Sequence, residues 1–344
     1  MLLLLACASF TFAAQIESPF NQRPLNLGEK EQAYSFLVGG HLYGAHGASV
    51  FPASSLLANI EFINTSGAKF FVSLGDIIRD TDSLHIANFQ NAFAAKLNMP
   101  LFNAVGNHDQ NRRQLYETQF GQTYFHFAFN REFFIFLDTE LNTGNIAGDQ
   151  LDSLRQAMRT AIANADIHNV FIFSHRLLWC VGNPDYQIVA AHVNEPFPKN
   201  NYKDEIEPIL FDLANHKRVY WISGDVGTYW SLPLFYQKVP NHHLTYIAAG
   251  IGDTGQDAIL QVNVSQSDDV GFAAISLAGQ KVYPVEHYGP AYWQNHFGSK
   301  PSVLQNTYGK FRRMLVHSYF WTGFLVAIPV GVLFILLSKR SANK

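Results

Sequence analysis

Cysteine and charge are both scarce in this chain. The 344 residues include two cysteines, Cys7 and Cys180, and Cys7 lies in an apolar N-terminal stretch. No intrachain disulfide is therefore expected in the mature chain, and cysteine usage does not indicate a redox compartment. Charged residues make up 15% of the sequence and hydrophobic residues 48%. That balance is apolar for a purely soluble protein and indicates membrane segments at the ends of the chain.

An excess of basic residues is also lacking. The 24 Lys and Arg stand against 27 Asp and Glu, which gives a formal net charge of −3. Because nucleic acid is usually bound by clustered Lys and Arg, we exclude it as a partner. No Gly-x-Ser-x-Gly nucleophile elbow is present, which argues against a serine hydrolase of the α/β type. The length suits one large α/β domain with additional segments.

Both ends of the chain are apolar. Residues 1–14 carry no charge and end in small residues, which predicts a signal peptide or a lipoprotein leader. Residues 319–337 are almost wholly apolar and long enough to span a bilayer core of about 30 Å. Basic residues flank both ends of this stretch, so they do not orient it. The leader places the preceding domain outside, and we expect a single-pass membrane protein with an extracytoplasmic domain, periplasmic or extracellular.

Apolar runs alternate with amphipathic segments between these ends. The expected strands are 35–38, 69–74, 99–105, 124–129, 132–138, 170–173, 218–222, 244–249, 258–264, 272–277 and 280–287. Helical spacing occurs at 54–65, 85–97, 112–120, 149–163 and 205–215, with Asp149 as an expected N-cap. The first three strands and their helices form a βαβαβ pattern. This pattern predicts an α/β domain with parallel strands, whose following loops gather at one edge of the sheet.

Polar clusters follow five of the expected strands. They are His41 with Tyr43, Asp76 with Asp80, Asn107-His108-Asp109, His175, and Asp225. One such residue alone is usually a surface turn, but five clusters at successive strand ends of one sheet indicate a site. Mixed Asp, Asn and His ligands suit Mn, Fe, Zn or Mg. One or two such divalent ions could hold a phosphoryl oxygen and activate water.

The stretch Gly106-Asn107-His108-Asp109 contains three polar side chains suited to metal-assisted phosphate chemistry. Asn107 offers a neutral oxygen ligand, and His108 is a donor that titrates near neutral pH. Asp109 is an acceptor that could orient the His108 imidazole. The irregular segment from Trp179 to Asn201 is rich in Pro, Asn and His, and we expect it to be a lid or a substrate loop.

These motifs resemble those of the calcineurin-like metallophosphoesterases, a family that includes the purple acid phosphatases. The matching pieces are Gly75-Asp76-Ile77-Ile78-Arg79-Asp80, Gly106-Asn107-His108-Asp109 and Ser174-His175, in the family's order and spacing. The resemblance covers residues 34–288 and implies two facing mixed sheets flanked by helices, an αββα sandwich. It also implies that Asp76 bridges two metals, that Asn107 and His175 bind the second metal, and that His108, paired with Asp109, meets the phosphate or leaving group.

The chain departs from the family at its first and last motifs. The family's Asp-x-His corresponds to Gly40-His41-Leu42-Tyr43-Gly44, most simply with His41 in the Asp place and Tyr43 in the His place. A shift by one residue would put Gly40 and Leu42 there. The family's Gly-His-x-His corresponds to Gly224-Asp225-Val226-Gly227. We therefore expect His41 and Asp225 to join Asp76, Asn107 and His175 as metal ligands.

Two functions are compatible with this pattern. The first is a metal-dependent phosphoesterase acting on a monoester, a diester or a pyrophosphate, with a phosphorylated small molecule or a glycan-linked phosphate as substrate. In it, His108 would act as general acid. The second is a catalytically impaired binding module on the same fold. The loss of the last motif's His favours the second function, whereas the intact Asp76, Asn107, His108, Asp109 and His175 favour the first.

Overall fold

The computed structural model describes residues 15–28, 30–44, 49–193, 199–227 and 232–297. The expected leader at 1–14 and the expected membrane span at 319–337 lie outside the described residues. Within the described ranges, no helix is both long and apolar enough to cross a membrane. The chain divides into a unit of Met1–Trp293 and a second unit of Gln294–Lys344, and the first unit holds all the predicted site residues.

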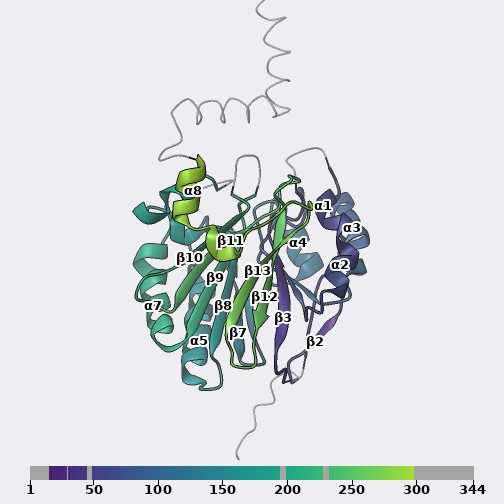
Figure 1. Cartoon of the computed structure of the whole chain (residues 1–344). Coiled ribbons are helices and arrows are strands. Elements are labelled where there is room, and N and C mark those ends of the chain that lie inside the picture. Colours follow the sequence, from purple (N-terminus) through teal and green to yellow (C-terminus); the bar gives the residue numbers. More distant parts are fainter. Residues whose placement is uncertain (1–14, 29, 45–48, 194–198, 228–231, 298–344) are drawn as a thin grey trace, which may run out of the picture. The chain divides into compact units, whose positions relative to one another are not determined.

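Two mixed sheets form the centre of the first unit (Figure 1). The five-stranded sheet has the order β13-β12-β3-β4-β5 and the six-stranded sheet the order β10-β11-β9-β8-β7-β6. Strands of the first are β3 (Tyr34–Gly39), β4 (Phe71–Ser73), β5 (Leu101–Asn103), β12 (Ala258–Val264) and β13 (Val270–Ser276). Strands of the second are β6 (Phe125–Phe129), β7 (Glu132–Phe136), β8 (Asn169–Ser174), β9 (Arg218–Ser223), β10 (Leu234–Lys238) and β11 (Leu244–Ala249).

Helices cover the outer faces of both sheets (Figure 1). The five-stranded sheet is covered by α1 (Ser54–Ala58), α2 (Ile60–Thr65) and α3 (Ser83–Ala92). The six-stranded sheet carries α5 (Gly148–Ala163) and α7 (Glu207–His216). Also present are α4 (Arg113–Phe120), α6 (Gln187–Ala190), α8 (Pro290–Phe297) and the short strands β1 (Gln15–Glu17) and β2 (Pro24–Asn26). The expected αββα layering is confirmed.

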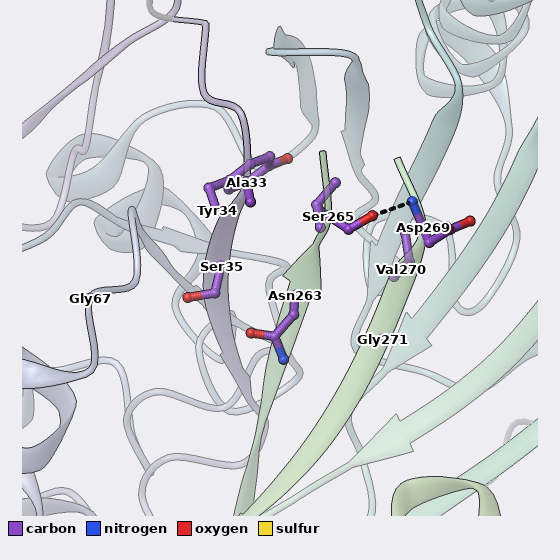
Figure 2. Close-up of a pocket in the computed structure, with 10 residues that line it drawn as sticks. Ala33, Tyr34, Ser35, Gly67, Asn263, Ser265, Asp269, Val270 and Gly271 are labelled. Atoms are coloured by element: carbon purple, nitrogen blue, oxygen red, sulfur yellow. Dashed lines mark hydrogen bonds between the residues drawn. The ribbon is translucent and has the colours of Figure 1, made fainter. Parts of the chain in front are cut away.

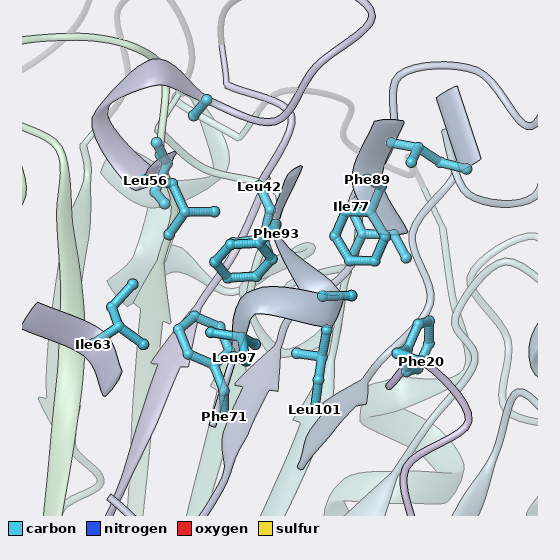
Figure 3. Packing of buried hydrophobic residues seen from close by; sticks show 14 of the residues in the cluster. Phe20, Leu42, Leu56, Ile63, Phe71, Ile77, Phe89, Phe93, Leu97 and Leu101 are labelled. Atoms are coloured by element: carbon cyan, nitrogen blue, oxygen red, sulfur yellow. The ribbon is translucent and has the colours of Figure 1, made fainter. Parts of the chain in front are cut away.

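Aromatic rings fill the space between the two sheets. The Phe36 ring of β3 lies 5.5 Å from that of Phe134 and 5.1 Å from that of Phe171, both in the six-stranded sheet. A second cluster, on the other face of the five-stranded sheet, packs Phe71 and Leu101 against Phe93 (Figure 3). Every residue of β3 is therefore buried, because the strand has apolar layers on both faces.

Strand direction brings the predicted loops to one edge of each sheet. Strands β3, β4 and β5 pair in parallel, and so do β7, β8 and β9. The segments after β3, β4 and β5 therefore lie at one edge of the five-stranded sheet, and those after β8 and β9 at one edge of the six-stranded sheet. The parallel pairing of β3, β4 and β5 confirms the βαβαβ pattern expected from the sequence. The expectation that all five polar clusters belong to one sheet is wrong: the two sheets face each other, and the loops of both meet where His175 Nδ1 lies 2.8 Å from Leu74 O.

Three local expectations are wrong. The helix expected at 54–65 is two helices, separated at Asn59, whose side chain donates to the carbonyl oxygens of Ser55 and Leu277. Residues 280–287 form no strand and end in a 3₁₀ turn (Val285–His287), since Pro284 lacks a donor for a sheet ladder. Helix α5 begins at Gly148, so Asp149 is not its N-cap. It lies inside the first turn, where a carboxylate interacts favourably with the helix dipole.

Candidate active site

The predicted site residues lie in the loops that follow β3, β4, β5, β8 and β9, and three have unusual backbone conformations. His41, Asp76 and Asp225 have φ of 57°, 57° and 47°. A positive φ is uncommon for a residue with a side chain and persists only where surrounding contacts enforce it. Here the first two loops hold each other: His41 N donates to Gly75 O at 3.0 Å, and Tyr43 N donates to Asp76 O at 3.1 Å.

His175 is at the centre of the cluster. Its Nε2 lies 3.1 Å from Asn107 Oδ1, 3.5 Å from Asp76 Oδ2 and 3.8 Å from Asp225 Oδ1. Its Nδ1 lies 2.8 Å from Leu74 O, an atom that can only accept a hydrogen bond. Burial, together with the Arg176 charge, lowers the pKa of His175 well below its ordinary value. The neutral imidazole therefore donates through Nδ1 and points its Nε2 lone pair at three oxygen atoms.

His41 makes a similar contact on the other side of Asp76. Its Nδ1 lies 3.1 Å from Ile251 O, and its Nε2 lies 3.7 Å from Asp76 Oδ2. The other Asp76 oxygen accepts from His108 N at 3.0 Å. Burial, together with the charges of Asp109 and Asp225, raises the pKa of Asp76 well above its ordinary value. The predicted reach between His41 and Asp76 is confirmed.

His108 does not pair with Asp109 in the way the sequence suggested. Its Nδ1 lies 2.6 Å from Arg79 O, so a backbone carbonyl orients the imidazole. The Nε2 atom lies 3.1 Å from the Tyr43 hydroxyl. Tyr43, the residue expected in the place of the first motif's His, thus contacts the proposed acid.

Asp109 instead holds the backbone of the neighbouring loop. It is fully buried, and its carboxylate accepts from the backbone nitrogens of Asp76 and Ile77, both at 2.8 Å, and of Gly106 at 2.9 Å. Burial is the largest cause that raises the pKa of Asp109, to about 6. Asp109 therefore positions Asp76 rather than the His108 ring.

Arg176 is a site residue that the sequence reasoning missed. Its side chain is 5% exposed; its Nη1 lies 2.9 Å from Asp225 Oδ2, and its Nε lies 2.7 Å from Glu140 Oε1. A second bond, from Nη2 to Glu140 Oε2 at 3.2 Å, makes this pair bidentate. The pairing leaves Asp225 Oδ1 facing His175. A charged residue directly after the strand-end His was the signal available in the sequence.

Two glycines of the site, Gly106 and Gly227, lie so close to neighbouring atoms that a side chain would not fit. A Cβ on Gly106 would lie 2.3 Å from Asp76 Oδ1, so a side chain there would displace the carboxylate. Gly227 has φ of +101°, and a Cβ there would lie 2.4 Å from the carbonyl carbon and oxygen of Gly250. The last position of the altered motif therefore has no room for a side chain.

The donor set fits a cation by its chemistry. Among the described residues, no three His, Cys, Asp or Glu side chains stand in the arrangement of a formed metal site. Yet the lone pair of His175 Nε2 faces oxygens of Asn107, Asp76 and Asp225 at 3.1–3.8 Å. Electron-pair donors that converge in a buried site repel one another unless a cation lies between them.

The pocket in Figure 2 is a different place. It is an open depression between the start of β3 and the hairpin of β12 and β13, lined by residues such as Ser35, Asn263 and Asp269 (Figure 2). The depression lies at the amino end of β3, whereas His41 of the candidate site follows its carboxyl end. None of the predicted site residues lines this depression.

Comparison with known proteins agrees with this architecture. No protein-family model matches the sequence, and no curated protein matches it significantly. Among solved structures, the chain is similar to a purple acid phosphatase isolated from yellow lupin (Lupinus luteus) seeds. The identity is 10% and the TM-score 0.51, over 75% of this chain and 53% of that chain. A dimetal phosphatase from Danio rerio matches at 12% identity and a TM-score of 0.49, over 71% of this chain and 96% of that one.

The likeness is one of fold: the chain has the fold of the calcineurin-like metallophosphoesterases. It spans about half, 53%, of the length of the lupin phosphatase.

Proposed function

We propose that this protein is a metal-dependent hydrolase of phosphoric ester bonds. The single observation that carries the proposal is the convergence on His175 Nε2 of Asn107 Oδ1, Asp76 Oδ2 and Asp225 Oδ1, within 3.1–3.8 Å. These residues, with His41 beside Asp76, would hold a divalent ion such as Mn, Fe, Zn or Mg. When bound, the ion would supply Lewis-acid polarisation of a phosphoryl oxygen and a water of lowered pKa.

Polar contacts within the chain hold two of the proposed ligands, Asp76 and Asp225, in place. Asp76 has one oxygen fixed by His108 N and the other directed at the two imidazoles. Asp225 is fixed by Arg176 in the same way, through one of its oxygens. Ligands held by further hydrogen bonds need little reorganisation when the ion arrives.

His108 is the proposed general acid. Its Nδ1 hydrogen bond to Arg79 O fixes the ring, so the proton it delivers must leave from Nε2. That atom now contacts the Tyr43 hydroxyl at 3.1 Å, and the substrate's leaving oxygen would take the place of this partner. His108 is half-buried, as is Asn107, whereas Asp76 and His175 are buried, so substrate reaches His108 and Asn107 more easily than the other two.

Substrate and location are proposed from the sequence. A monoester, diester or pyrophosphate on a small molecule or a glycan would suit the site. The chain would be anchored in a membrane by residues 319–337, with its domain on the extracytoplasmic side. The altered first and last motifs favour a second candidate, a catalytically impaired binding module, because Gly227 has no room for a ligand side chain.

The test is hydrolysis of nitrophenyl mono- and diesters and nucleotide-sugar pyrophosphates, with each metal supplied in turn. His108→Ala should retain metal and fold while turnover falls about 10²–10⁴-fold, the usual scale for a lost general acid. His126→Ala, which removes an exposed imidazole on β6, is the matched control. If the wild-type protein hydrolyses none of these esters with any metal, the enzyme proposal fails and the binding module stands.

A further inference from the structure

The two halves of the candidate site belong to different sheets. Asp76 and Asn107 follow β4 and β5 of the five-stranded sheet, whereas His175 and Asp225 follow β8 and β9 of the six-stranded sheet. The 3.1 Å distance between Asn107 Oδ1 and His175 Nε2 is therefore set by how the loops of the two sheets are held against each other. Contacts outside the ligand set orient metal ligands and tune their affinity.

Asp138, in the loop after β7, joins a loop of each sheet. Its side chain is fully buried, and its Oδ2 accepts from Gln110 Nε2 at 2.8 Å and from Arg113 Nη1 at 2.9 Å. Both donors belong to the segment that follows β5. The other oxygen, Oδ1, accepts from the backbone nitrogens of Glu140 at 2.9 Å and Leu141 at 3.0 Å. One buried carboxylate therefore holds the segment after β5 against the loop after β7.

The hydrogen bonds continue from the Asp138 loop to Asp225. The Glu140 side chain holds the Arg176 guanidinium through two bonds, and Arg176 Nη1 lies 2.9 Å from Asp225 Oδ2. The Asp138 backbone is also fixed, because its nitrogen donates to Gln150 Oε1 at 2.7 Å and its carbonyl oxygen accepts from Gln150 Nε2 at 3.0 Å. Asp138 is thus anchored to α5 and linked to the support of a proposed ligand.

Gln110 connects Asp138 to the loop that carries Asn107. Its backbone nitrogen donates to Asn107 O at 3.3 Å, and its side-chain nitrogen donates to Asp138. The other side-chain atom, Oε1, is buried and has no hydrogen-bond partner among the described residues. Within that part of the chain, the bond to Asp138 is therefore the polar contact that holds the Gln110 side chain.

We propose that Asp138 is a positioning residue of the candidate metal site. Its two oxygens fix the segment after β5 against the loop after β7, and so set the separation of Asn107 from His175. The proposal rests on the proposed metal-dependent function. In this account Asp138 contacts neither ion nor substrate; it acts through Asn107 on one side and Asp225 on the other.

The test is the affinity for Mn²⁺ of a variant that keeps the shape of Asp138. In Asp138→Asn the amide oxygen can still accept from the two backbone nitrogens after β7, but the amide nitrogen opposes the donors of Gln110 and Arg113. Full-length protein in detergent is stripped with a chelator and titrated with Mn²⁺, and free Mn²⁺ is measured by electron paramagnetic resonance. We expect an affinity about tenfold lower than that of the wild type, the scale for a lost outer contact of a metal ligand, with an unchanged circular dichroism spectrum.

A donor–acceptor exchange separates positioning from a general loss of stability. Asp138→Asn combined with Gln110→Glu reverses the direction of the bond, keeps the net charge and leaves a carboxylate near Arg113, so it should restore most of the lost affinity. Gln110→Met removes the bond from the other side; it should also lower the affinity, and it carries the test if Asp138→Asn does not fold. The matched control is Glu117→Gln, which removes the exposed partner of Arg113 and should bind Mn²⁺ as the wild type does.

Two kinds of result overturn the proposal in distinguishable ways. Wild-type affinity in both Asp138→Asn and Gln110→Met, or a loss that the exchange does not recover, would refute the positioning role and leave the metal-dependent function intact. Absence of bound Mn²⁺ in the wild-type chain would refute both.

Discussion

The Nη1 atom of Arg176 lies 2.9 Å from Oδ2 of Asp225, inside the protein and next to the candidate metal ligands. The same guanidinium holds Glu140 in a bidentate pair. Two carboxylates therefore depend on one buried cation for their charge balance, and one of them is a proposed ligand. This pairing links the stability of the domain to the geometry of its site.

Replacing Arg176 should be costly. Arg176→Gln leaves Asp225 and Glu140 buried without their cation, and we expect a loss of about 3–5 kcal/mol in the free energy of unfolding. The control is Arg218→Gln, which breaks the exposed pair with Asp269 and should cost about 0–1 kcal/mol. Urea unfolding followed by circular dichroism measures both. Equal losses for the two variants would show that the buried pairing contributes little.

The Tyr43→Phe variant tests the contribution of the hydroxyl separately from that of the ring. The variant keeps the ring contacts with His41 and His108 but loses the 3.1 Å contact between the hydroxyl and His108 Nε2. We expect unchanged metal content and a rise or fall in kcat of no more than about tenfold, since His108 keeps its bond to Arg79 O. Steady-state kinetics with elemental analysis test this. A complete loss of bound metal would mean that the Tyr43 oxygen is itself a ligand.

Glu132 should make stability depend on pH. It is fully buried on β7 and accepts from Tyr34 Oη at 2.8 Å and Asn169 Nδ2 at 3.1 Å. Burial is the largest cause that raises the pKa of Glu132. A carboxyl whose folded pKa is raised contributes stability below its unfolded pKa, and that contribution is lost as pH rises through the folded pKa.

The measurement is the free energy of unfolding of wild type and Glu132→Gln between pH 4 and pH 8. The difference between the two curves should change by up to about 1.4 kcal/mol per pH unit over the window from the unfolded pKa to the raised one. Above that window the difference should be constant. A difference that grows in the opposite direction, with wild type gaining stability as pH rises, would refute the assignment.

Removal of residues 319–344 should release a folded domain. This stretch is apolar and terminal, and the sheets and their helices end before it. We expect the truncated chain to remain in the supernatant after ultracentrifugation without detergent and to keep the circular dichroism spectrum of the full chain. Aggregation of the truncated chain, with a well-behaved full chain in detergent, would contradict the anchor.

The sequence identified most of the site because parallel topology is readable from it. Asp76 and Asn107 follow neighbouring parallel strands of one sheet, which the βαβαβ pattern predicts. His175 follows a strand of the other sheet, so its place beside them depends on how the two sheets face each other. The roles of Asp109 and Arg176 depend on long-range partners, the amide of Asp76 and the carboxylate of Asp225, which no local pattern encodes. The break at Asn59 has the same origin, since its side chain is held by a carbonyl 218 residues away.

The most direct test of the account is restoration of hydrolysis by metal after chelator treatment. Stripped wild-type protein should be inactive toward bis-nitrophenyl phosphate and regain activity on addition of Mn²⁺, Fe²⁺, Zn²⁺ or Mg²⁺. Asp76→Asn, which keeps the shape of the side chain but removes the charge between His41 and His175, should bind no ion and stay inactive after the same addition. Full activity of the stripped wild type, or of Asp76→Asn, would contradict the metal-dependent site.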